Sequence, residues 1–266
     1  MPSNRLNLWS TFRVPPGTCL CWQGGPLSLY LHRDGDDWRV AYDVERGATW
    51  LPGLDRVEEP PECDWTHYTF DETADRVTFA PVMPDRPLIV SSETPTVIPP
   101  RLRAELYLPL PVWVQLTISG GKRTKGGRGA VPSWVLPAID PYPLSDTWFG
   151  DLFSGELGYS LNTPARHDVD ILEHDPLRAV CQMTVFNRSE ADLPITRFGV
   201  RTDSLAVFLG ERRLWANDIY VVHRGTSEET RIKYGDGPNR LVQNAQCLTP
   251  ARGSKDANLL KLNFAL

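Results

Sequence analysis

The chain has 266 residues, of which 41% are hydrophobic and 23% charged, a composition typical of a folded globular protein and not of a disordered one. Its net charge of −5 gives the whole molecule no attraction for nucleic acid or for an anionic membrane, so any such binding would need a local basic patch. The 24 prolines interrupt helices and the 9 tryptophans favour sheets, and together they predict an all-β protein.

The N-terminal residues and the longest apolar stretch predict a cytoplasmic protein with no membrane insertion. Residues 1–17 contain no apolar run of the kind found in a signal peptide. The longest apolar stretch, residues 106–114, is too short to span a bilayer and contains two prolines. The five cysteines are irregularly spaced, which is typical of reduced thiols, and Cys19 and Cys21 are expected to be small core residues.

Two hairpins are predicted in the first part of the chain. In residues 26–43 apolar side chains alternate on both sides of an Asp34-Gly35 turn, as in a hairpin with one buried face. Residues 65–81 show a second pair of strands that turn over residues 71–75. The intervening residues 47–61 are rich in proline and glycine and are expected to be irregular.

The clearest strand covers residues 105–119, where one face is apolar at every second position. That face consists of Leu106, Leu108, Leu110, Val112, Val114, Leu116 and Ile118. Pro109 and Pro111 fall on the other face, and N–H groups two residues apart point to the same side of a strand. These prolines therefore remove two successive donors, and we expect a long edge strand whose outer side resists pairing with other molecules.

This strand leads into SGGKRTKGGRG, residues 119–129, which has no apolar side chain. A nucleotide-binding phosphate loop would need a Gly-Lys-Ser/Thr sequence followed by a helix, and the chain has neither at this position. The loop is interpreted as a solvated tip, and weak contact with an anion or nucleic acid is the alternative. The residues that would make this contact are Lys122, Arg123, Lys125 and Arg128.

Residues 144–161 predict a further hairpin, rich in aromatic and acidic side chains. Paired carboxylates beside aromatic rings are typical of glycoside hydrolases. The same residue types are common in any β-protein, because aspartate caps turns and tryptophan fills cores, and we favour this second interpretation. The carboxylates are Asp140, Asp146, Asp151 and Glu156, and the rings are Tyr142, Trp148, Phe153 and Tyr159.

The pattern then changes to that of one short helix over residues 163–178. Thr163 is the expected N-cap, Pro164 suits the first helical position and Pro176 would end the helix. We expect this helix to connect two packed antiparallel β-sandwiches, jelly-roll-like in character, formed by residues 1–162 and 179–266. A single merged sandwich is the alternative.

The predicted helix also carries the densest group of potential metal ligands. At about 100° per residue, His167, Asp170 and His174 would lie within one sector of a helix. Two imidazoles and a carboxylate could bind Zn²⁺ or a similar ion, with a fourth position open to water. The more common explanation of such a face is a solvated polar surface, which we favour.

Residues 178–225 alternate between apolar runs and turns and predict further strands. The turn at residues 187–192 begins with Asn187-Arg188-Ser189, which matches the acceptor sequence for N-glycosylation. In a protein without a secretory signal this sequence is interpreted as turn chemistry alone.

Four segments together have a distinctive order: RLRAELYLPLPVWVQL, DPYPLSDTWFGDLFSGELGYSL, VCQMTVFNRSEADLPITRFGVRTDSLAVFL and LWANDIYVVHRG. They are a proline-bearing strand, a hairpin with Trp/Tyr and Gly, an Asn-containing hairpin and an apolar strand. In this order they resemble the uncharacterised prokaryotic family called domain of unknown function 432, over roughly residues 100–225. The resemblance implies a β architecture and no established activity.

The motifs with a defined catalytic geometry are absent from the sequence, including the G-x-S-x-G elbow and the dinucleotide fingerprint. The sequence therefore predicts a non-catalytic binding or assembly module, without a cofactor, that contacts a protein partner or another copy of itself. A metal-dependent hydrolase that uses His167, Asp170 and His174 is the alternative.

Overall fold

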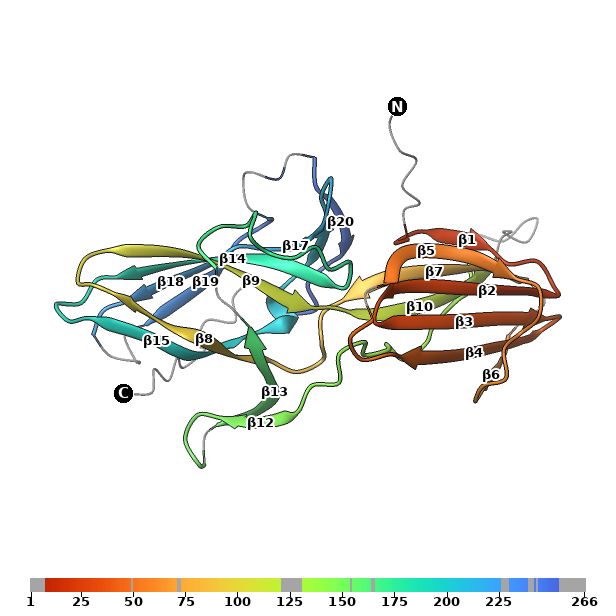
Figure 1. Cartoon of the computed structure of the whole chain (residues 1–266), viewed down its shortest axis with the longest axis horizontal. Helices are drawn as coiled ribbons and strands as arrows, with labels where there is room; N and C mark the ends of the chain where they lie inside the picture. The colour runs from red at the N-terminus through yellow and green to blue at the C-terminus, as the bar shows by residue number, and fades with distance from the viewer. Residues whose placement is uncertain are drawn as a thin grey trace. The chain divides into compact units, whose positions relative to one another are not determined.

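The computed structural model of the chain describes residues 8–48, 50–70, 73–120, 131–153, 155–163, 166–225, 230–238, 242 and 244–253 (Figure 1). These residues form strands β1–β20 and one short 3-10 helix, η1 (Thr202–Ser204). The predicted all-β class is therefore confirmed. The candidate anion-binding residues Lys122, Arg123, Lys125 and Arg128 lie outside the described residues.

The chain divides into two compact units that alternate along the sequence. Unit 1 consists of Met1–Pro81 and Trp113–Tyr142, and unit 2 consists of Val82–Val112 and Pro143–Leu266. The chain thus passes from one unit to the other after residues 81, 112 and 142. These bounds differ from the predicted division into residues 1–162, 163–178 and 179–266, which assumed that each domain is one continuous piece of chain.

Unit 1 contains two antiparallel sheets. The first has the order β5-β2-β3-β4-β6, with β5 (Trp50–Val57), β2 (Thr18–Gly25), β3 (Leu27–Asp34), β4 (Asp37–Val44) and β6 (Thr66–Thr69). The second has the order β1-β7-β10-β11, with β1 (Thr11–Arg13), β7 (Ala74–Val82), β10 (Trp113–Gly120) and β11 (Ser133–Val135). The predicted β3–β4 hairpin is present and turns at Gly35, whose φ of 62° favours glycine. Trp22 of β2 stacks on Phe79 of β7, with ring centroids 5.8 Å apart, so the core of this unit lies between its two sheets.

Unit 2 also contains two sheets, and both mix parallel with antiparallel pairs. The smaller has the order β12-β13-β8-β15, with β12 (Asp146–Phe149), β13 (Glu156–Thr163), β8 (Leu88–Ile98) and β15 (Leu193–Val200). The larger has the order β19-β18-β14-β17-β16-β20. Its seventh strand, β9 (Arg103–Pro111), also pairs with β14 (Arg178–Asn187). Its other strands are β16 (Val207–Leu209), β17 (Leu214–Ala216), β18 (Ile219–His223), β19 (Arg231–Tyr234) and β20 (Gln246–Thr249). Strand β13 runs parallel to β8, and β14 runs parallel to β17 and β18.

The alternating stretch at residues 105–119 forms two strands instead of one. All seven of its apolar side chains are buried, as the period of two predicts. The stretch breaks at Val112, so that β9 belongs to unit 2 and β10 to unit 1. Alternation alone could not reveal this break, because Val112 continues the same burial pattern across it.

The predicted helix at residues 163–178 is absent from the part of this segment that the structure describes. Instead, the segment covers the outer edge of β9. Tyr107 exchanges backbone hydrogen bonds with Arg166, at 2.7 and 3.3 Å, and on the same side of β9 the carbonyls of Glu105 and Pro109 accept from the side chains of His167 and Arg178, at 3.0 and 3.4 Å. Pro109 and Pro111 follow Tyr107 on this side of β9 and have no N–H to satisfy. Tertiary pairing with a donor-poor edge therefore outweighs the local preference for a helix.

Candidate functional site

The three predicted metal ligands are engaged separately along the segment that covers β9. The Nδ1 of His167 donates to the carbonyl of Glu105 at 3.0 Å, and the Nε2 of His174 donates to the carbonyl of Arg212. The backbone N–H of Asp170 bonds the carboxylate of Asp168 at 2.9 Å, which is a local turn contact. Among the described residues, no group of three or more His, Cys, Asp and Glu side chains is arranged to hold a metal ion. The single helix face that motivated the metal prediction does not form.

The carboxylates and rings of residues 140–159 are divided between the two units. Asp140 and Tyr142 belong to unit 1, whereas the other members belong to unit 2. The carboxylate of Asp146 pairs with Arg86 at 3.0 Å. The hydroxyl of Tyr159 donates to Asp85 at 2.8 Å, and partial burial together with this carboxylate raises the pKa of Tyr159 to about 12.

Hydrogen bonds and a close ring contact join described residues of the turn between β12 and β13. Two donors converge on the carbonyl of Asp151: the N–H of Gly155 at 2.8 Å and the indole Nε1 of Trp148 at 3.1 Å. Gly150 has a φ of 107°, a conformation that side chains rarely adopt. A Cβ on Gly155 would lie 2.5 Å from the Trp148 indole, so the ring is seated directly against the turn. The sequence thus fixes this tip through glycine at two positions and through one tryptophan.

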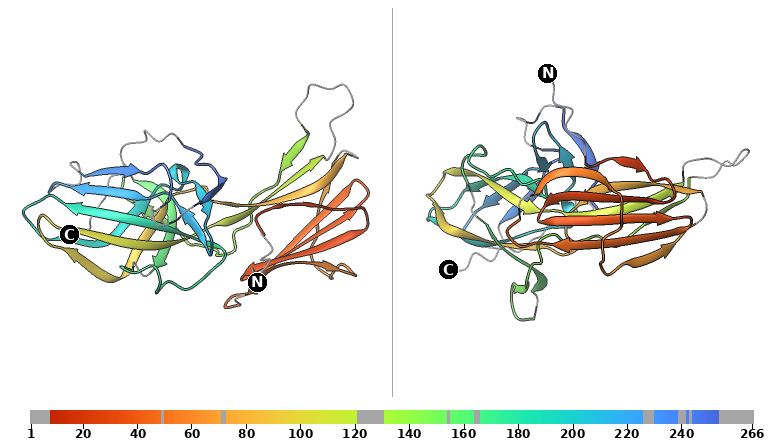
Figure 2. Two further views of the ribbon diagram at one scale, coloured as in Figure 1. Left: turned by 90° about the horizontal axis from the view of Figure 1, so that it is seen from above. Right: turned by 45° about the vertical axis from the view of Figure 1, so that its right-hand side comes forward.

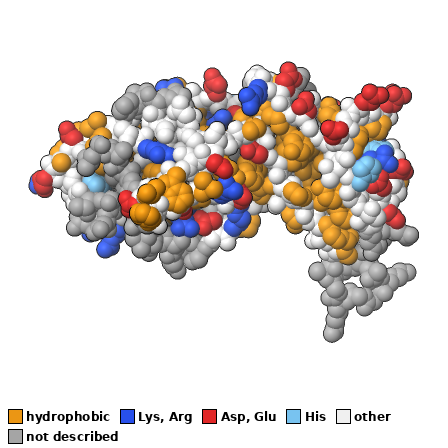
Figure 3. Space-filling view, turned by 90° about the horizontal axis from the view of Figure 1, so that it is seen from below, with side chains coloured by type: hydrophobic (Ala, Val, Ile, Leu, Met, Phe, Trp, Pro, Cys, Tyr) orange, Lys and Arg blue, Asp and Glu red, His pale blue; other side chains and the backbone are white. Residues whose placement is uncertain are grey.

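The turn and its flanking strands present apolar side chains to solvent. Phe153 is 97% exposed and Leu152 is 78% exposed. Trp148 and Leu157 face each other across β12 and β13 and remain 46% and 43% exposed. We call these four residues the apolar tip. The hairpin forms one end of the sheet β12-β13-β8-β15, and its turn projects from unit 2 in Figure 1 and in the right-hand view of Figure 2. Figure 3 shows the molecule from below the view of Figure 1, where apolar side chains gather on the surface among basic and acidic ones.

Arg197 of β15 reaches across the sheet to the hairpin. Its Nη2 donates to the Thr147 hydroxyl at 2.8 Å and to the Trp148 carbonyl at 3.2 Å, and its guanidinium lies 5.5 Å from the centre of the Phe149 ring. Glu156 is the direct cross-strand neighbour of Phe149. Within the described part of the chain, neither Arg197 nor Glu156 forms an ion pair. Successive residues of a strand point to opposite faces, so Arg197 and Glu156 lie on the Phe149 face of the hairpin and Trp148 and Leu157 lie on the other. Glu156 also interacts electrostatically with Arg201.

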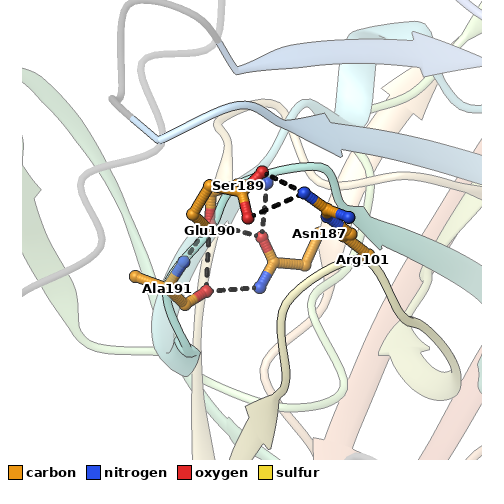
Figure 4. Close-up of polar contacts among 5 residues, drawn as sticks. All are labelled: Arg101, Asn187, Ser189, Glu190 and Ala191. Atoms are coloured by element: carbon orange, nitrogen blue, oxygen red, sulfur yellow. Dashed lines mark hydrogen bonds and ion pairs between the residues drawn. The ribbon is translucent and has the colours of Figure 1, made fainter.

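The turn that contains the possible glycosylation sequence is held by a buried asparagine (Figure 4). The Nδ2 of Asn187 donates to the carbonyls of Ile98 and Ala191, both at 2.8 Å, and its Oδ1 accepts from the backbone N–H of Ser189 at 3.0 Å and from its hydroxyl at 2.7 Å. Asn187 is fully buried. Its amide therefore holds the turn through hydrogen bonds, which is consistent with the interpretation of Asn187-Arg188-Ser189 as a turn sequence.

The apolar tip was not singled out by its sequence as a site. The signal is present in GDLFSGE, residues 150–156, where two large apolar residues occupy the centre of a turn made otherwise of glycine, serine and acidic residues. Turn centres are usually polar, because they lie at the surface. Two apolar residues there indicate exposure for a reason other than folding.

The comparison with protein families agrees with the resemblance seen in the sequence and extends it. The model of the family described as Protein of unknown function (DUF432) matches residues 8–266, which includes both units. No curated protein and no solved structure matches the chain. No helix in the described part of the chain is long and apolar enough to cross a membrane.

Proposed function

This chain belongs to the DUF432 family, and we propose that it is a non-catalytic binding module whose contact with protein is the apolar tip of the β12–β13 hairpin. The observation that carries the proposal is the exposure of Leu152 and Phe153 on a turn fixed by hydrogen bonds. Single exposed apolar residues are common on protein surfaces, but a contiguous group marks an interaction site.

Contacts within the chain hold the described residues of the tip before it binds a partner. A mobile loop would lose conformational freedom on binding, and this loss would offset part of the gain from burying its apolar side chains. Here the convergence of two donors on Asp151 and the seating of Trp148 on Gly155 already fix the turn. Large apolar side chains on a fixed support are typical of residues that dominate binding energy.

No observation on the described residues favours the hydrolase alternative, since His167 and His174 bond two different backbone carbonyls. Weak anion contact through residues 119–129 stays a prediction, and it would act independently of the hairpin.

The proposal is tested by the behaviour of the tagged chain in native cell extract on size-exclusion chromatography. We expect the wild type to elute in a species larger than the monomer, and the Leu152→Ser/Phe153→Ser variant to elute as a monomer. Ile171→Ser is the matched control, because Ile171 is 65% exposed and lies outside the hairpin. Identical elution of the wild type and the double variant would contradict the proposal.

A further inference from the structure

We infer that the outer face of the larger sheet of unit 2 binds single-stranded nucleic acid, with aromatic side chains stacked on bases and cations on the phosphates. The site lies where β9, β14, β18 and β19 pair side by side (Figure 1). It includes no residue of the apolar tip and goes beyond the proposed function. Because the whole chain has a net charge of −5, binding of this kind needs a local basic surface.

Strand register places the outward side chains of these four strands in two neighbouring rows. Residues 183, 185 and 187 of β14 and residues 219, 221 and 223 of β18 are buried, so the residues between them point to the opposite face. Successive cross-strand neighbours in the first row are Arg103, Phe186, Val222 and Arg231. In the second row they are Glu105, Thr184, Tyr220 and Lys233. We call these two rows, with Arg188 beside them, the basic face.

Two aromatic rings occupy the middle of the basic face. Phe186 and Tyr220 stand diagonally on neighbouring strands, and both are partly exposed, Tyr220 by 38%. The hydroxyl of Tyr220 donates to the buried carboxylate of Asp218 at 3.3 Å, two residues back along β18, which holds the ring along the sheet. Rings on neighbouring strands of an open sheet face are a typical platform for stacking successive bases of a single strand.

Four exposed cations surround these rings: Arg103, Arg188, Arg231 and Lys233. The guanidinium of Arg188 lies 5.9 Å from the centre of the Phe186 ring. Arg103 pairs with Glu105 at 3.6 Å, whereas the other three cations form no ion pair with a carboxylate in the part of the chain that the structure describes. Exposed rings among unpaired cations are complementary to a polyanion whose bases are free to stack, which describes a single strand and not a duplex.

The number of cations sets the strength and the salt dependence of binding. With three or four phosphate contacts, the logarithm of the affinity should fall with the logarithm of salt concentration with a slope of about −2 to −3. The dissociation constant should be on the order of 10 µM at low salt, within the usual range of sequence-independent binding.

The test is fluorescence anisotropy of a labelled oligouridylate of about 12 nucleotides, titrated with purified protein to about 300 µM at several salt concentrations. Arg231→Ala/Lys233→Ala should weaken binding about tenfold and make the salt slope shallower by about 1.4. The matched control is Arg46→Ala/Arg56→Ala, which removes two exposed cations from unit 1 and changes the net charge equally. No saturable binding by the wild type, or equal weakening in the two variants, overturns the inference.

Stacking is tested separately from charge. Tyr220→Leu and Phe186→Leu keep an apolar side chain but remove the ring, so each should weaken binding about fivefold to tenfold and leave the salt slope unchanged. Circular dichroism establishes which variants are folded, and unchanged affinity in a folded variant contradicts the stacking role.

Two further outcomes would assign the binding elsewhere and overturn the inference. The first is displacement of the oligouridylate by oligoglutamate of the same length as readily as by unlabelled oligouridylate, which would identify an acidic protein segment as the ligand. The second is loss of binding when Lys122, Arg123, Lys125 and Arg128 are replaced by alanine, with binding retained in Arg231→Ala/Lys233→Ala. None of these results bears on the proposed function, because Leu152 and Phe153 are not part of the basic face.

Discussion

The side chain of Asn187 forms several hydrogen bonds, and it is fully buried, so water cannot take the place of its partners. Its side chain joins the turn after β14 to the end of β8, through Ile98 and Ala191, while Ser189 satisfies its oxygen. A buried polar group that loses its partner costs far more than a satisfied hydrogen bond contributes. The exposed Arg101–Glu190 ion pair beside it contributes little by comparison, because water screens it (Figure 4).

Replacement of Asn187 by alanine should therefore destabilise the protein by about 3 kcal/mol, since several buried donors and acceptors lose their partner together. Urea unfolding followed by circular dichroism measures this change in the free energy of unfolding. Glu190→Ala is the control, and it should cost less than about 1 kcal/mol because its ion pair is exposed. Equal losses for the two variants would show that the buried network is not what holds this turn.

A second prediction at this scale concerns Cys181, which is fully buried and donates to the carbonyl of Asn217 at 3.2 Å. Burial, with a smaller contribution from Asp218, raises the pKa of this thiol well above its ordinary value of 9.0. The unfolded chain therefore loses this proton at a lower pH than the folded chain. The stability contribution is complete below about pH 9 and falls as pH rises above it, by up to about 1.4 kcal/mol per pH unit.

Cys181→Ser keeps a donor for Asn217 but removes the ionisation. Its free energy of unfolding, measured from pH 7 to pH 11, should fall less steeply above about pH 9 than that of the wild type. Parallel curves for the two proteins would mean that the thiol does not stay protonated in the folded state. Other buried groups add to the alkaline loss in both proteins, including Cys19, whose pKa burial raises to about 11.

At the scale of elements, the strands were predictable wherever one face alone is buried. The hairpin of β3 and β4 and the alternation from Leu106 to Ile118 follow from side-chain period and turn chemistry. The segment at 163–178 was not predictable in this way, because its conformation depends on the edge of β9, which is distant in sequence. Pro109 and Pro111 predicted that one side of this strand would be an edge, but they did not indicate which residues would cover it.

The zinc content of the purified protein tests whether His167, Asp170 and His174 bind a metal ion. Because His167 and His174 bond two different carbonyls, we expect purified protein to contain much less than one equivalent of zinc. The His167→Ala/His174→Ala double variant should then give the same value by elemental analysis. One equivalent of zinc in the wild type that is lost in the double variant would restore the hydrolase alternative.

The tip of the β12–β13 hairpin shows why sites are harder to predict than strands. Trp148 and the flanking glycines predict a hairpin in this place, and the hairpin is present. Whether Phe153 packs inward or faces solvent is decided by the seating of Trp148 on Gly155, a contact that no period in the sequence encodes.

At the scale of the whole molecule, two β units are built from four alternating pieces of one chain. The sequence predicted two β bodies, but local patterns contain no signal for a chain that leaves a unit and later returns to it. The family match covers residues 8–266 and so includes both units, while the apolar tip belongs to unit 2 alone.

We propose that the apolar tip is where this protein contacts another protein chain. The most direct measurement places a photo-crosslinking phenylalanine analogue at position 153 and, in a matched protein, at position 171, followed by irradiation in cells and in purified solution. We predict one discrete crosslinked species from position 153, lost when Leu152 is also replaced by serine, and no such species from position 171. Absence of a discrete product at position 153, or equal products at both positions, would contradict the claim.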